Sequence, residues 1–229
     1  MFNPEALSKS ILEIYPEEYL LASFKSFSWQ KMGPEVALRK RKDVEDICPA
    51  QGSSEEEITR FYSIVNKWGF NRYLPDPILS EPRNRKIFKR LFDTWYHIDF
   101  EERQADLIES LAAILLIPKL GIATVSKFIA LANPTDAAIY DSRVTAALNS
   151  IRLEDQRIFP MVGRRQLKSK RYFFADSITT DKAKSRIMAE RYLLFLKTLD
   201  TLKKNCVSFE TSAQIEMALF MIGKDIERE

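Results

Sequence analysis

Apolar residues recur at helical spacing along most of the chain. The stretch 181–204 repeats them close to the 3.6-residue period of a helix, at Ile187, Tyr192, Leu193, Leu196 and Leu199. No alternation of apolar and polar positions is long enough to predict a strand. The pattern therefore predicts an all-α protein, with helices over about 4–14, 16–27, 35–46, 55–68, 83–96, 101–116, 121–132, 142–150, 181–204 and 211–224.

The helix boundaries carry recognisable signals. Pro-Glu pairs open the first two segments, and Ser53 or Ser54 precedes three glutamates as an N-cap would. Residues 69–82 contain one glycine and three prolines, which indicates a loop that crosses between two lobes. We therefore expect a two-lobed helical fold. Residues 1–82 would form an N-terminal helical region with a linker, and residues 83–229 a second region, unless both form one compact unit.

Composition narrows the classes of function. Six glycines in 229 residues are few for sheet-rich, Rossmann or P-loop folds. The net charge of +3 and pI near 8.7 permit a nucleic-acid partner without requiring one. Basic residues cluster in three runs, which are most simply read as solvated faces, at 39–42, 83–90 and 164–171.

The inventory of reactive side chains is small. With two distant cysteines and His97 as the only histidine, no usual zinc or iron–sulfur site can be built, so we expect no metal and no cofactor. His97 has no evident partner for a catalytic triad. No apolar run is long enough to span a membrane, and no signal peptide opens the chain. These features predict a cytoplasmic protein with free thiols and no membrane partner.

A tight turn between two apolar helices is the most informative segment. In Ile117-Pro118-Lys119-Leu120-Gly121-Ile122-Ala123, Pro118 should end the first helix and Gly121 should supply unusual backbone angles. Such a turn can direct backbone N–H groups, and the positive end of the second helix, at a DNA phosphate. Alone it is weak evidence, because many helical proteins turn this way.

The next element makes the turn more significant. The second helix should end at Asn133-Pro134, and Asp141 lies 20 residues after Gly121, where another helix begins. The segment from about Leu107 to Leu148 resembles the hairpin and catalytic-aspartate region of the helix-hairpin-helix DNA glycosylase superfamily. The phrases Gly-Ile-Ala-Thr-Val-Ser-Lys and Ile-Tyr-Asp-Ser-Arg-Val, and Glu216 to Phe220 with Gly223-Lys224, also resemble bacterial 8-oxoguanine-glycosylase-like proteins.

The resemblance implies an enzyme that binds duplex DNA and cleaves the N-glycosidic bond of a damaged base such as 8-oxoguanine. It covers about 40 residues well, and it has departures. Lys119 replaces the first hairpin glycine, and Ala123 stands where the nucleophilic lysine of bifunctional members lies. Lys127 is one turn (about 5.4 Å) further along the same helix face. It is the candidate Schiff-base nucleophile; otherwise excision would rely on Asp141 and a water.

Asp141 suits the chemistry of base excision. Breaking the bond between base and sugar builds oxocarbenium-like charge on the deoxyribose, which a nearby carboxylate stabilises. The alternative is that Asp141 only caps its helix. Arg143 has two interpretations as well: it contacts a DNA phosphate, or it pairs with an acidic side chain of the protein.

The remaining DNA contacts are expected from the hairpin and from the third basic run. The resulting set is Lys119, Leu120, Gly121, Ile122, Ala123, Thr124, Arg143, Arg164, Arg165, Lys168, Lys170 and Arg171. Tyr172, Phe173, Phe174 and the three tryptophans are candidates to stack on an extruded base, with core packing as the default.

Two other functions fit the same residues. The first is a catalytically inactive helix-hairpin-helix module that binds DNA, which the alanine at position 123 and the imperfect hairpin favour. The second is a helical protein-interaction domain in which the hairpin is only a turn. The sequence identifies neither a protein partner nor the base that would be removed.

Overall fold

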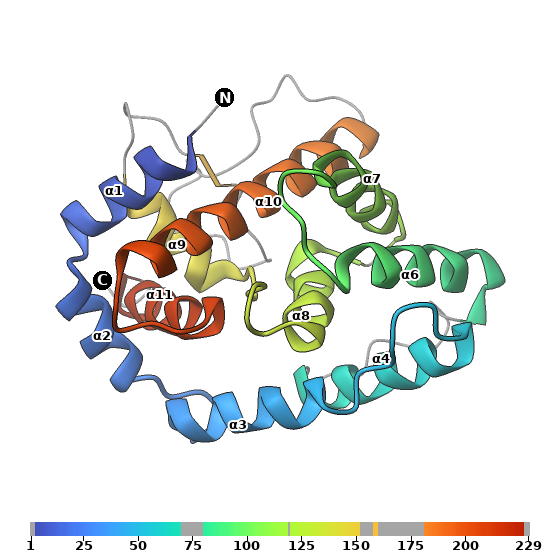
Figure 1. Ribbon diagram of the computed structural model, residues 1–229, viewed down its shortest axis with the longest axis horizontal. Coiled ribbons are helices and arrows are strands. Elements are labelled where there is room, and N and C mark those ends of the chain that lie inside the picture. The colour runs from blue at the N-terminus through green and yellow to red at the C-terminus, as the bar shows by residue number, and fades with distance from the viewer. Residues whose placement is uncertain (1–2, 70–79, 119, 152–157, 160–180, 227–229) are drawn as a thin grey trace.

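The computed structural model describes residues 3–69, 80–118, 120–151, 158–159 and 181–226, and the prediction of an all-α fold is confirmed (Figure 1). These residues form no β-sheet. The helices are α1 (Pro4–Ile14), α2 (Glu17–Lys25), α3 (Pro34–Glu45), α4 (Glu55–Gly69), α6 (Pro82–Trp95), α7 (Gln104–Leu115), α8 (Ile122–Ala132), α9 (Ser142–Ser150), α10 (Asp181–Asn205) and α11 (Ser212–Ile226).

Local chemistry explains where several helices begin. The Asn3 side chain accepts a hydrogen bond from the backbone N–H of Glu5 at the start of α1. At α4, the Ser54 hydroxyl accepts from the Glu57 N–H, and the Glu57 carboxylate accepts from the Ser54 N–H in return. This reciprocal capping box places the N-cap at Ser54, one of the two expected positions.

Helix α11 lies at the centre of one group of helices. Almost every residue from Ser212 to Gly223 is buried, and the helix packs against α9, α2 and α3. The long helix α10 packs against α7 and α1, while α4 and α6 pack against each other. Helix α8 contacts both α3 and α4, so it lies between the group of helices around α11 and the pair α4 and α6, as Figure 1 shows.

Gly223 permits a close approach between α11 and α9. A Cβ atom at this position would lie 1.8 Å from the carbonyl oxygen of Arg143 on α9. Because that neighbour is backbone, no side-chain movement could relieve the overlap. The glycine therefore allows α11 to pack directly against the first turn of α9.

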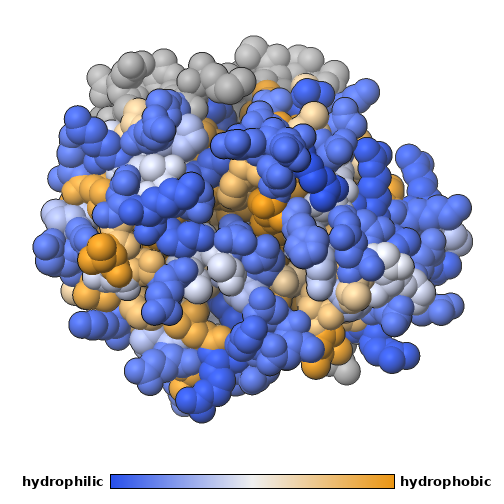
Figure 2. Space-filling view, viewed as in Figure 1, coloured by the Kyte–Doolittle hydropathy of each residue, from blue (hydrophilic) through white to orange (hydrophobic). Residues whose placement is uncertain are grey.

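The surface is mixed in character. In Figure 2, apolar side chains line a hollow near the middle of the face that is shown, and hydrophilic side chains surround it. Within the described part of the chain, no helix combines the length and apolar character needed to cross a bilayer.

Candidate functional site

A small cavity opens where α3, α8, α11 and the start of α9 meet. Its volume is about 50 Å³, and it combines aromatic walls with four ionisable side chains. The lining residues are Phe27, Trp29, Ala37, Arg41, Lys127, Ile139, Asp141, Glu216 and Phe220. Two of these, Lys127 and Asp141, are the residues that the sequence indicated as catalytic candidates.

Asp141 is both a helix cap and a wall of this cavity. Its carboxylate accepts hydrogen bonds from the backbone N–H groups of Arg143 and Val144, each at 3.0 Å, as an N-cap does. Burial nevertheless raises the pKa of Asp141 to about 6, and the nearby Glu216 carboxylate adds to the rise. The two backbone hydrogen bonds and Lys127 oppose it. At neutral pH the group is therefore largely ionised, although burial makes that charge costly.

Three helices fix the loop that carries Asp141. The backbone N–H of Tyr140 donates to the Ser126 hydroxyl on α8 at 3.0 Å. The Tyr192 hydroxyl on α10 donates to the Ala138 carbonyl at 2.9 Å. On the α11 side, the Ile139 N–H donates to a carboxylate oxygen of Glu216 at 3.3 Å. These buried hydrogen bonds hold the loop on both sides, so the position of Asp141 is set by the core.

Lys127 approaches the cavity from α8. Its side chain is half-buried, and desolvation lowers the pKa of its ammonium group, with a smaller contribution from the positive charge of Arg41. The carboxylates of Asp141 and Glu216 act in the opposite direction. A desolvated lysine has a larger neutral fraction near pH 7 than an exposed one, which is the form that attacks carbon electrophiles.

Arg41 and Glu216 complete the charged set, and the sequence did not indicate either as a site residue. Their side chains are 4% and 3% exposed. Arg41 donates from both terminal nitrogens to the two carboxylate oxygens, at 2.5 and 3.2 Å. Arg41 belongs to the first basic run, which was expected to be solvated, and its burial corrects that expectation for this residue. The signal that was missed is Glu216, a charge inside an otherwise apolar stretch of α11.

A tight turn after α2 places Trp29 against the cavity. Trp29 and Met32 exchange two backbone hydrogen bonds, at 2.9 and 3.2 Å. The two residues between them, Gln30 and Lys31, have φ angles of 50° and 65°. Turns of this kind usually contain glycine or asparagine, so two long side chains here store backbone strain beside the cavity.

The described residues of the turn between α7 and α8 include both buried and exposed positions. Ile117, Leu120 and Ile122 are buried, whereas Pro118 and Gly121 are exposed. Helix α8 begins at Ile122, with Gly121 as an N-cap that makes no side-chain hydrogen bond. The expectation of unusual backbone angles at Gly121 was wrong. Its φ of −110° and ψ of 166° are extended values that any residue adopts.

The structure describes some of the other predicted DNA contacts, and the rest lie outside the described residues. The side chains of Leu120 and Ile122 point into the core, so only their backbone groups can reach a ligand, and Ala123 and Thr124 are half-buried. The guanidinium of Arg143 lies over the Phe220 ring, 4.6 Å from its centroid. The remaining predictions lie outside the described residues: Lys119, Arg164, Arg165, Lys168, Lys170, Arg171 and the aromatics 172–174.

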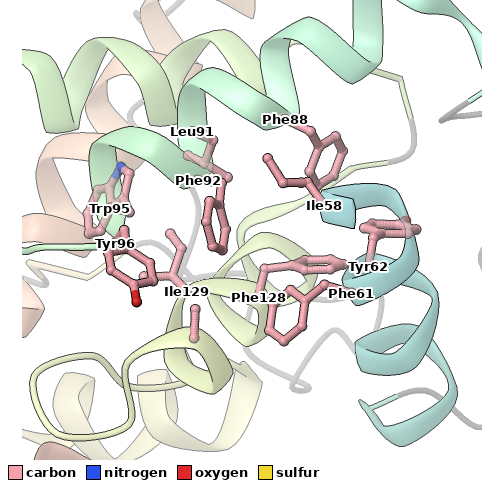
Figure 3. A pocket seen from close by; sticks show the side chains of 11 residues that line it. Ile58, Phe61, Tyr62, Phe88, Leu91, Phe92, Trp95, Tyr96, Phe128 and Ile129 are labelled. Atoms are coloured by element: carbon pink, nitrogen blue, oxygen red, sulfur yellow. The ribbon is translucent and has the colours of Figure 1, made fainter. Parts of the chain in front are cut away.

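A second pocket, lined by aromatic rings, lies between α4, α6 and α8 (Figure 3). Its volume is about 20 Å³, and its walls are almost entirely apolar. Tyr62 stacks on Phe128 with ring centroids 4.3 Å apart, and Phe88 meets both rings edge-on. Trp95 lies at the far end and donates its indole N–H inward, to Ser110 and Leu107. This region is a packed core with no charged group to perform chemistry.

Other reactive groups contribute little to the described surface. Burial raises the pKa of the Cys48 thiol to about 12, which keeps it protonated and unreactive. Cys206 is buried, and neither cysteine forms a disulfide. Among the described residues, no three His, Cys, Asp or Glu side chains gather closely enough to hold a metal ion.

No family model, no curated protein and no solved structure matches the chain. Any function must therefore be argued from the cavity itself.

Proposed function

We propose that this protein is a DNA glycosylase that removes a damaged base with Lys127 as nucleophile and Asp141 as the essential carboxylate. The observation that carries the proposal is that both side chains line one cavity, although they come from different helices. The sequence resemblance brought Asp141 forward, and the desolvation of Lys127 supplies an independent reason to assign the lysine a chemical role.

The reaction would proceed by displacement at C1′ of the deoxyribose. The neutral amine of Lys127 forms a bond to C1′ as the bond to the base breaks, and the electron pair leaves with the base. Asp141 stabilises the positive charge on the sugar and accepts a proton from the amine, which it delivers to the departing base. The second amine proton passes to the ring oxygen as the sugar opens, which leaves a Schiff base between Lys127 and C1′.

The geometry of α8 supports DNA as the partner. Its N-terminus at Ile122 follows the exposed Gly121, and the first N–H groups of a helix have no acceptor within the helix. Ile122 lies about 7.5 Å along the helix axis from Lys127, given 1.5 Å per residue, and a phosphate at the N-terminus would lie beyond Ile122. One helix would thus hold the DNA backbone at one end and present the nucleophile further along.

The test is base release from duplexes that each contain one lesion, with 8-oxoguanine first. We expect the wild-type protein to release at least one damaged base and Asp141→Asn to release it at least about 100-fold more slowly, as for the loss of one acid–base group. Glu109→Gln, on the exposed surface, is the matched control and should keep the wild-type rate. Absence of release from every duplex would refute the proposal.

A second candidate is a helix-hairpin-helix module that binds DNA without excising a base. The size of the cavity favours it, because about 50 Å³ holds a few water molecules, whereas a cavity known to bind benzene measures about 150 Å³. An extruded base would therefore require the walls to move. Binding that weakens steeply with salt, without base release, would indicate this second function.

A further inference from the structure

The Arg41–Glu216 pair is unusual in its position as well as its burial. It joins α3, near the N-terminus, to α11, near the C-terminus, and the two residues are 175 positions apart. A buried ion pair contributes little net stability, since desolvation offsets much of the attraction. Its location on the wall of the cavity therefore calls for a reason beyond folding.

Glu216 connects this pair directly to the loop of Asp141. One carboxylate oxygen accepts both from Arg41 and from the backbone N–H of Ile139, two residues before Asp141. The same carboxylate lies close enough to influence the charges of both Lys127 and Asp141. Glu216 thus holds the loop and contributes a fixed negative charge to the cavity.

We infer that Glu216 and Arg41 are positioning residues, which hold Asp141 at the cavity wall and set the charge balance between it and Lys127. Two cationic and two anionic side chains line the cavity. A change in one charge therefore alters the electrostatic energy of the other three. The inference deepens the proposed function, yet its central measurement needs no DNA.

Glu216 and Arg41 should shift the pKa values of neighbouring groups in opposite directions. Glu216 raises the pKa of Asp141 and that of Lys127, because a negative neighbour disfavours a carboxylate and favours an ammonium. Arg41 lowers the pKa of Lys127 for the converse reason. Arg143, whose backbone N–H donates to Asp141, keeps its guanidinium over the Phe220 ring and is unchanged in these variants.

The substitution Glu216→Gln separates charge from position. A glutamine has the same shape, and its oxygen can still accept from the Ile139 N–H and from one Arg41 nitrogen, so the loop should stay in place while the negative charge is lost. Its amide nitrogen cannot accept from the second Arg41 nitrogen, so that one hydrogen bond is lost as well. We expect the carboxyl group of Asp141 to titrate about one pH unit lower than in the wild type. Arg41→Gln, which leaves Glu216 without its counter-charge, should move the same midpoint upward.

The measurement is a carbon-13 NMR titration of the Asp141 side chain in the full chain without DNA. Glu13→Gln is the matched control, because Glu13 lies in an exposed i,i+4 pair on α1 and should leave the midpoint unchanged. The amide signal of Ile139 reports whether the loop has moved. If either single variant fails to fold, Arg41→Gln with Glu216→Gln removes both charges together. Asp141 should again titrate lower, by less than in Glu216→Gln.

An unchanged midpoint in Glu216→Gln, or in the double variant where the single one does not fold, would overturn the inference. Where the wild type releases a base, the acidic limb of its pH–rate profile should shift with the midpoint in each variant. A protein without base release would refute the proposed function, and the titration would still decide the role of the pair.

Discussion

Helix α8 separates an apolar region from a region that contains charged side chains. On one side, Phe128, Ile129 and Ala132 face the aromatic pocket, where rings pack closely and no charge is present. On the other, Lys127 faces the cavity with Arg41, Asp141 and Glu216. Residues 127 and 128 are adjacent in sequence and serve opposite purposes. The apolar side stabilises the fold, whereas the polar side keeps charges at partly desolvated positions, which is common where side chains perform chemistry.

The largest effect should come from Lys127→Met, which keeps the length of the side chain and removes its amine. We expect base release to fall by at least about 1,000-fold, because a covalent nucleophile has no substitute in the cavity. The melting temperature should change little, because relief of the desolvation of the cation offsets the loss of its attraction to Asp141 and Glu216. Rate measurements on a lesion duplex, beside thermal unfolding, check both. Normal activity in the Lys127→Met variant would assign the chemistry elsewhere.

Arg41→Met should have the next largest effect, on stability. Removal of one partner leaves the Glu216 carboxylate buried and uncompensated, which typically costs about 3–5 kcal/mol. Urea unfolding at pH 7 measures the loss. Lys42→Met is the control, because Lys42 is its exposed neighbour and pairs only at the surface. Equal stability in both variants would mean that the buried pair is not formed.

Phe128→Ala tests the opposite face of α8. The ring contacts both Tyr62 and Phe88, so its removal from the aromatic pocket should cost about 3 kcal/mol in the free energy of unfolding. Activity per folded molecule should stay close to wild type, in contrast to Lys127→Met. Loss of activity in protein shown to be folded would mean that the two sides of α8 are not independent.

The smallest effect concerns the pH dependence of stability at Asp141. Its pKa is raised to about 6 in the folded state, so the folded protein binds this proton more tightly than the unfolded chain does. Ionisation therefore lowers stability as pH rises from about 4 to 6, and the loss is complete above that range. Asp141→Asn should remove this slope and be more stable than wild type at pH 7 by about 1–2 kcal/mol, a figure reduced for partial exposure.

Unfolding curves at pH 4, 5, 6 and 7 would show the difference between the two proteins growing with pH. A constant difference would mean that Asp141 titrates normally in the folded state. No residue that lines the aromatic pocket should show such a slope, because none of them is an acid or a base that titrates in this range.

The helices were predictable from the sequence because each is marked by local signals. Apolar spacing gave their extents to within a few residues, and the Ser54–Glu57 capping box and Pro118 mark ends that the structure confirms. The position of Asp141 at the start of a helix was also predictable, because an N-cap is recognised from the residues that follow it. These features depend on short stretches of chain.

The pairing of Arg41 with Glu216 was not predictable in the same way. Arg41 looks like any member of a basic run, and only the tertiary packing of α3 on α11 shows that it is buried. The turn at Trp29 was missed because Gln30 and Lys31 are not residues that usually adopt positive φ. Tertiary contacts override local preference at both places, and both lie at the cavity.

The role of Lys127 is tested most directly by identifying the residue that bonds covalently to DNA. The protein is incubated with lesion-bearing duplexes and sodium borohydride, and the trapped adduct is digested and located by mass spectrometry. We expect an adduct on Lys127, absent from Lys127→Met and retained in Phe128→Ala. A protein that releases a base yet gives no adduct, or gives one on another residue, would contradict the assignment of Lys127.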